Sequence, residues 1–192
     1  NSKTSLVGAG IDFGKIDSVD EQLTGLQFSL DYRYGMPVEK DRKSFGQVDI
    51  GLQWFENLSS RTYFAQRLLA GGTSTHTLQY WYYLGGLDRI RGFADNRFAG
   101  RYFWLSNSEL RMRTFAFDFF NQPLVLQNTV FYDTIAASEE FDDLGNASGA
   151  SIGTGLRFIA PRIYRFVARL DYAKPVLRRD EMNVSFGVQQ FF

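Results

Sequence analysis

The sequence predicts an all-β chain that forms an antiparallel transmembrane β-barrel, or a large part of one. Apolar and polar side chains alternate over about 8–9 segments, each near the ~10 residues that a tilted strand needs to cross a bilayer. Short and long connections alternate between the segments, as in outer-membrane barrels. Aromatic residues make up 17% of the chain, and several lie near the ends of the apolar faces, where interfacial girdles form.

Four strands are expected before the longest connection. Residues 4–13 alternate apolar residues with glycine and aspartate. Residues 24–34 place leucine, phenylalanine and tyrosine opposite glutamine, serine, aspartate and arginine, and residues 46–55 follow a similar pattern. Residues 61–70 alternate less cleanly, with apolar residues opposite Arg67. A period of two predicts strands that have one apolar and one polar face.

Five strands are expected after that connection. Residues 101–115 separate tyrosine, tryptophan, leucine and methionine from asparagine, glutamate and arginine. Residues 123–133 alternate only weakly, whereas residues 150–160 set isoleucine, leucine and phenylalanine against serine, glycine and arginine. Residues 163–173 and 182–192 alternate again, and the second of these ends the chain on two phenylalanines. The same period of two predicts a strand for each segment.

The connections follow the same alternation, with one exception. The expected short connections are 55–61, 115–123 and 160–163. The expected long and mostly polar connections are 34–46, 71–101, 133–150 and 173–182. The connection 14–23 breaks the rule, because it is too long for a short turn.

The longest connection contains the loop 72–100, which holds the most distinctive motif of the chain. It carries a glycine pair followed by an Arg-Gly-Phe triplet: Gly85, Gly86, Arg91, Gly92 and Phe93. Glycine permits the tight turn that sends the arginine and the phenylalanine in different directions. Long loops in compact domains are usually functional, so we expect this one to carry the site.

This loop motif, followed by the run Asn-Ser-Glu-Leu-Arg at 107–111, resembles the signature of the BamA and two-partner-secretion transporter (bacterial surface antigen) superfamily. The resemblance implies a barrel integral to the outer membrane of a Gram-negative bacterium, which inserts or secretes proteins. It also implies that the loop folds back into the barrel. Residues 1–192 would then form a single domain, the C-terminal portion of such a barrel.

The resemblance also suggests partners for the loop arginine. The segment Phe131-Tyr132-Asp133 is similar to the family's wall motif, which carries the acidic partner, and its parity places Phe131 and Asp133 on one face. A charged Arg91 would be costly in a low-dielectric interior without a carboxylate, and Glu109 and Asp171 are further candidates. A bidentate contact would lock the loop against the wall. In the alternative interpretation, the pair stabilises the fold and has no role in transport.

The loop phenylalanine and the inner wall are expected to fit together. The polar faces are rich in glycine, and the resemblance implies that Phe93 packs against such inner-wall glycines, with Gly153 and Gly155 as candidates. Removing side chains from the wall leaves room for a loop inside.

The end of the chain resembles the C-terminal signal strand of outer-membrane proteins. Phe186, Val188 and Phe192 alternate with polar residues there. We expect these three residues to form the recognition pattern of that strand.

The number of strands favours a larger assembly. A barrel of about eight strands has an interior just wide enough for its own side chains, so it could not also hold the loop. We therefore expect half of a barrel of about sixteen strands, completed by a missing N-terminal half or by a second copy of the chain. The alternative is a small closed barrel with the loop outside.

Composition excludes several other classes. Lysine plus arginine and aspartate plus glutamate both number 21, so no basic excess indicates nucleic acid. Cysteine is absent and one histidine is present, which argues against a thiolate metal site and a zinc enzyme. No phosphate-loop, Rossmann or serine-nucleophile motif is visible, so no cofactor and no enzymatic activity are expected. The acidic stretch 139–143 lacks the spacing of a calcium loop and is expected to be a solvated outer loop.

Two functions fit these observations. The first is a barrel that assists the insertion or secretion of a polypeptide client through its lumen or a lateral seam. The second is a passive outer-membrane pore or barrel anchor. Both functions need the lipid bilayer as a partner. Both would be excluded if the chain were a soluble β-sandwich with a dry apolar core.

Overall fold

The computed structural model describes residues 3–19, 22–38, 43–146, 148–162, 166–177 and 183–188. The four strands before the longest connection are β1 (Thr4–Val19), β2 (Gln22–Pro37), β3 (Phe45–Asn57) and β4 (Thr62–Thr73). The five strands after it are β7 (Tyr102–Phe119), β8 (Gln122–Ser138), β9 (Ser148–Ile159), β10 (Val167–Leu177) and β11 (Asn183–Val188). These nine strands form one antiparallel sheet in the order β1-β2-β3-β4-β7-β8-β9-β10-β11, which confirms the all-β antiparallel class.

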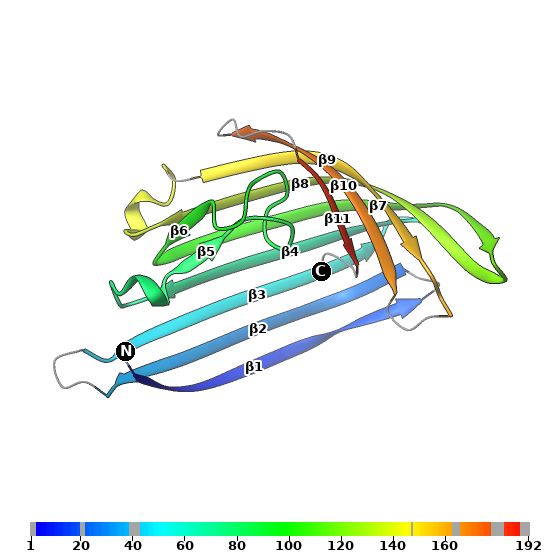
Figure 1. Cartoon of the computed structure of the whole chain (residues 1–192). Helices are drawn as coiled ribbons and strands as arrows, with labels where there is room; N and C mark the ends of the chain where they lie inside the picture. The colour runs from blue at the N-terminus through cyan, green and yellow to red at the C-terminus, as the bar shows by residue number, and fades with distance from the viewer. Residues whose placement is uncertain are drawn as a thin grey trace.

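The connection between β4 and β7, residues 74–101, has structure of its own, and we call it the central loop. It contains a 3-10 turn, η1 (Leu78–Tyr80), and a small ladder between β5 (Tyr82–Leu84) and β6 (Phe98–Gly100). Figure 1 shows the main sheet curved into a trough, with the central loop on its concave side. A second 3-10 turn, η2 (Phe141–Asp143), lies between β8 and β9. None of the helices in the described ranges is long and apolar enough to cross a membrane.

The expected alternation of connections is present without the exception. The prediction of a long connection at residues 14–23 was wrong. β1 continues to Val19, and its ladder with β2 runs unbroken to the pair Val19–Gln22. The end of β1 carries Lys15 and Asp17, whose side chains are 76% and 52% exposed. These charged residues replace the apolar side chains of the same face, while Ile16 on the other face packs against buried side chains, so the expected pattern is reversed although the backbone ladder persists.

Most other strands also run past their expected ends. β7 extends to Phe119 rather than to residue 115, and β8 extends to Ser138 rather than to Asp133. β10 begins at Val167, and the expected start at Ile163 lies outside the described residues.

The two faces of the sheet have reversed polarity compared with a soluble β-sandwich. Glu109, Arg111 and Asp133 face the concave side and are 0% exposed. Trp104 and Val130, on the opposite face of the same strands, are 40% and 45% exposed. Charged groups are therefore inside and large apolar groups outside, which is the opposite of a dry apolar core.

An apolar cluster fills the space between the central loop and the wall, near the end of the sheet where the loop leaves it. Its buried members come from the loop and from β7 and β8: Leu84, Ile90, Phe93, Phe98, Phe103, Leu105, Ile135 and Ala137. Burial of these side chains holds the loop against the sheet.

The sheet is open along its two edges. Within the described ranges, no ladder joins β1 to β11. Leu6 and Val7 are neighbours that point to opposite faces of β1, yet they are 51% and 59% exposed. Neither face of this long edge strand is covered, so the chain alone has the form of a partial barrel.

Candidate functional site

The arginine of the loop motif is buried on the concave wall. Arg91 donates from Nε to Asp133 Oδ2 and from Nη2 to Asp133 Oδ1, both at 2.8 Å, and its Nη1 donates to Glu109. Its backbone N–H also reaches Asp133 Oδ2 at 3.3 Å. All three side chains are 0% exposed. The parallel pair of bonds to Asp133 fixes the orientation of the guanidinium as well as neutralising its charge.

The pair belongs to a larger buried network. Glu109 accepts a second bond from Arg111 Nε at 2.6 Å, and Arg157 Nη1 donates to Asp171 Oδ1 at 2.6 Å. Arg157 Nη2 lies 3.6 Å from Glu109, and Arg91 Nη1 lies 3.9 Å from Asp171. Together with Arg91 and Asp133, these residues form three cations and three anions, so the formal charges cancel. Cancellation is what allows so many charges to remain buried.

The charge of Arg91 is secure in this setting. Burial lowers the pKa of its guanidinium, but the carboxylates of Glu109 and Asp133 raise it further, so that the pKa lies above the ordinary arginine value. The plane of the guanidinium also covers the ring of Phe131, with Cζ 3.4 Å from the ring centroid. Stacking on an aromatic face adds a cation–π contribution to the ion pairs.

The two wall glycines expected next to the loop phenylalanine lie under the groups of this network instead. Gly153 faces the ring of Phe131, and Gly155 lies beside the carboxylate of Asp171. Phe93 instead packs edge-on against Phe98 of the loop, with ring centroids 5.1 Å apart. Phe93 does lie against a wall glycine, but at Gly149, where a Cβ would meet its ring at 3.4 Å. Gly153 and Gly155 instead make room for Phe131 and Asp171.

Two glycines give the loop motif its shape. Gly86 has φ +70°, and its backbone N–H donates to Phe93 O at 3.2 Å, which closes the loop on itself. Gly92 has φ +88°, and a Cβ there would lie 3.3 Å from Cβ of Ala173 and of Ser151. Glycine is needed at Gly92 for its left-handed backbone and for its close approach to the wall.

The comparison with protein families bears on this geometry. The model of the Omp85 superfamily domain matches residues 2–192. The chain belongs to the Omp85 superfamily. The resemblance that the loop motif indicated is thereby confirmed. No curated protein matches the chain.

In this Omp85 chain the tip of the central loop has a second set of anchors, which sequence reasoning missed. Arg67 of β4 donates to Asn107 Oδ1 from Nε at 2.9 Å and to the backbone oxygen of Asp88 at 2.9 Å. Asn107 Nδ2 in turn donates to the backbone oxygen of Arg89 at 2.9 Å. From the other side of the trough, Arg169 Nη2 lies 3.5 Å from the backbone oxygen of Leu87. The available signal was that Arg67 and Asn107 share the polar faces of neighbouring strands.

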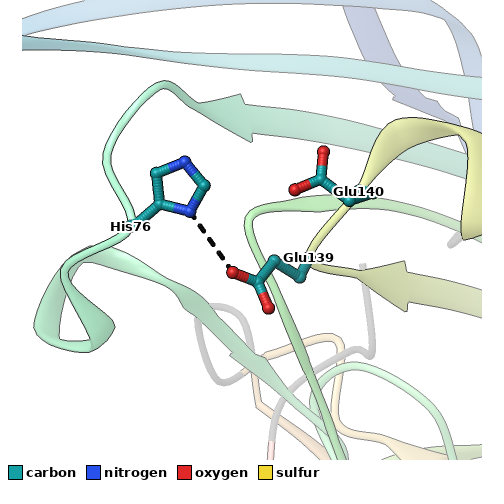
Figure 2. A group of neighbouring side chains, drawn as sticks. All are labelled: His76, Glu139 and Glu140. Atoms are coloured by element: carbon teal, nitrogen blue, oxygen red, sulfur yellow. Dashed lines mark hydrogen bonds and ion pairs between the residues drawn. The ribbon is translucent and has the colours of Figure 1, made fainter.

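The rim of the trough holds a further polar cluster. Figure 2 shows His76 of the central loop beside Glu139 and Glu140, which follow β8. His76 Nδ1 lies 3.3 Å from Glu139 Oε1, and the three side chains form a possible metal-ligand group within the described residues.

Arg101 decides the chemistry of this cluster. Its Nη1 lies 3.1 Å from His76 Nε2, and its Nη2 donates to Glu140 Oε1 at 3.0 Å. Because arginine only donates, His76 Nε2 must accept and Nδ1 must carry the proton that faces Glu139. A metal on Nδ1 would require a proton on Nε2, against the donors of Arg101. The cluster therefore acts as an ion-pair clamp that ties both ends of the central loop to the β8–β9 connection.

The C-terminal signal strand is described only in part. Phe186 and Val188 lie in β11, which pairs with β10 through Leu170–Phe186 and Ala168–Val188. Phe192 lies outside the described residues. The role of these three residues in recognition stays a prediction.

Proposed function

We propose that this chain is part of a barrel, integral to a bacterial outer membrane, that assists the insertion or secretion of polypeptides. One observation carries the membrane setting: the convex face exposes large apolar side chains, whereas the concave face buries charges. An exposed apolar surface of this extent needs lipid as its solvent. Membership in the Omp85 superfamily supports the insertion or secretion activity.

The working parts in this proposal are the edge strands and the loop. Among the described residues, the outer edges of β1 and β11 pair with no further strand, and such edges offer a template to which a client strand can pair. The central loop is held to β7 and β8 by buried hydrogen bonds and to β4 and β10 by partly buried ones, so it keeps the wall of β7 to β10 in one shape. The client would then add strands to an edge while the loop-bound wall remains rigid.

A second candidate is a passive pore, and one feature favours it. The loop does not fill the trough beside β2 and β3, where a cavity of about 580 Å³ remains. Asp31, Arg33 and Asp49 line it from the wall, and Arg89 lines it from the loop. A hydrated, charge-lined space could pass small solutes.

Liposomes that contain the purified protein separate the two candidates. An unfolded test barrel protein is added, and its folding into the liposomes is followed with and without the Omp85 chain. We expect the chain to accelerate folding, and we expect Arg91→Ala to lose most of that acceleration.

The matched control is Arg33→Ala, which removes a partly exposed arginine of the same wall that pairs with Asp49. This variant should keep the activity. Absence of acceleration by the wild-type chain, together with stable small-solute conductance in planar bilayers, would reject the assembly role and favour the pore.

A further inference from the structure

The ribbon formed by the end of β7 and the start of β8 extends past its neighbours. The β4–β7 ladder ends at the pair Thr62–Met112, and the β8–β9 ladder begins at Val125–Ile159. The β7–β8 ladder continues to Phe119–Gln122. Within the described ranges, residues 114–124 therefore pair with no strand other than β7 and β8, and Figure 1 shows this hairpin projecting beyond the sheet at the end that carries the short connections.

A β-bulge sets the direction of the side chains in this ribbon. The register between β7 and β8 shifts between Arg113 and Phe115. Before the bulge, odd-numbered residues such as Arg111 face the concave side. After the bulge, Phe115 and Phe117 face the convex side. They pair with Leu126 and Leu124, which belong to the even-numbered, outward-facing residues of β8. The extra residue thus redirects both phenylalanines toward the exterior.

The two phenylalanines form an exposed apolar pair that continues the convex face. They are 53% and 36% exposed, and their ring centroids are 5.8 Å apart. An isolated two-stranded hairpin is marginal in water, so a ribbon with an apolar side needs a surface to rest on.

Distance along β7 indicates which surface this is. Trp104 faces outward near the start of the strand, and Phe115 lies roughly 36 Å further along at about 3.3 Å per residue. At a tilt of about 45° this corresponds to roughly 25 Å along the membrane normal, the height of the apolar band of outer-membrane barrels. Trp104 and Phe115 therefore mark opposite borders of the band.

Exposed arginines accompany the ribbon. Arg61 is exposed on the turn between β3 and β4, and Arg162 is exposed on the turn after β9. Arg162 Nη1 donates to the backbone oxygen of Asn121 at the tip of the hairpin, at 3.3 Å. Aromatic rings next to cations suit the boundary between acyl chains and phosphate headgroups.

We propose that residues 114–124 are a lipid anchor. In this arrangement Phe115 and Phe117 lie at the acyl–headgroup boundary of the leaflet on the side of the short connections, and Asp118, on the other face of the ribbon, meets water. The inference rests on the outer-membrane location proposed above. It adds a specific contact that holds the β7–β8 wall at a fixed depth.

The absence of cysteine allows single-cysteine spin labelling. Labels are placed by Phe117→Cys, by Asp118→Cys on the opposite face, and by Val130→Cys in the middle of the convex face. Accessibility to oxygen, which partitions into lipid, is compared with accessibility to a water-soluble nickel complex in liposomes that contain an anionic lipid. Phe115→Cys replaces Phe117→Cys should that variant not fold.

The expected result is that the label at 117 is reached mainly by oxygen, at a shallower depth than the label at 130. The label at 118 should be reached mainly by nickel. If the label at 117 is as accessible to the nickel complex as the label at 118, while the label at 130 remains in lipid, the lipid anchor is overturned but the membrane location is not. Shielding of 117 from both reagents would overturn it in favour of a protein partner. A label at 130 that is open to nickel would overturn the membrane location itself.

Discussion

At the scale of the residue, the loop arginine is the best-defined feature of this chain. Arg91 combines two parallel bonds to Asp133, a bond to Glu109 and stacking on Phe131, all without exposure to solvent. Removing one partner of a buried ion pair leaves an uncompensated charge, which is more damaging than the loss of an exposed pair. Arg33 provides the comparison, because its pair with Asp49 lies on the same wall but is 45% exposed on the arginine side.

We therefore predict that Arg91→Ala lowers the free energy of unfolding by about 3–5 kcal/mol, because Asp133 is left buried without its bidentate partner. Arg33→Ala should cost less than about 1 kcal/mol. Unfolding in detergent, followed by circular dichroism against denaturant, measures both.

A double-mutant cycle tests the pairing itself. Asp133→Ala should resemble Arg91→Ala, and the double variant should cost clearly less than the sum of the two single costs. Strict additivity would show that the two side chains act independently. Unchanged stability of both single variants, with activity intact, would contradict the lock.

At the scale of the element, β9 supplies space at Gly153, where a side chain would otherwise stand. A Cβ at Gly153 would collide with the ring of Phe131 and with the backbone oxygen of Tyr172. Because Phe131 lies directly under Arg91, a shift of its ring would displace the loop. The missing side chain at Gly153 of β9 thus determines where Phe131, and with it Arg91 of the loop, can lie.

Gly153→Ala is expected to destabilise the protein by about 1–3 kcal/mol through overpacking. The matched control is Gly145→Ala, because a Cβ at Gly145 meets nothing within 4 Å. This control should change stability by less than about 0.5 kcal/mol. Thermal unfolding in detergent compares the two variants, and equal effects would mean that the wall tolerates a side chain under Phe131.

At the scale of the whole molecule, the open edges determine what the sheet can form. β1 is 16 residues long and exposed on both faces, and β11 bounds the other side of the trough. Such an edge pairs readily with another strand. Two sheets of nine strands would give eighteen, which is within the range of large outer-membrane barrels.

We predict that the isolated chain forms a barrel of two copies in detergent. Light scattering should give twice the protein mass of one chain. Cysteines introduced by Ala9→Cys in β1 and Val184→Cys in β11 should be joined between two chains by a flexible bis-maleimide.

If light scattering gives the mass of one chain, and the two cysteines are cross-linked within the same chain, the larger barrel is contradicted. A barrel that forms only with strands of another polypeptide would keep the larger barrel and reject the second copy.

Sequence patterns alone located the strands of the main sheet along the chain and the apolar and polar face of most of them. Period-two alternation is a local property, so it survives in the sequence wherever one face meets lipid and the other a polar interior. It failed at Lys15 and Asp17, which put polar side chains on the exposed face of Phe13, whereas Ile16 on the other face packs against buried apolar side chains. The acidic partners of Arg91 were also within reach, because a buried cation needs carboxylates and the resemblance pointed to Asp133.

Only the tertiary structure decided how the loop is held and where its parts rest. Arg67 and Asn107 are distant from the loop tip in sequence, and only the curvature of the sheet brings them to the backbone of Asp88 and Arg89. The contact of Phe131 with Gly153 likewise depends on the register of β8 and β9, and the outward direction of Phe115 depends on the bulge in β7. Register is fixed by cross-strand packing between distant segments, and a local sequence pattern carries no record of it.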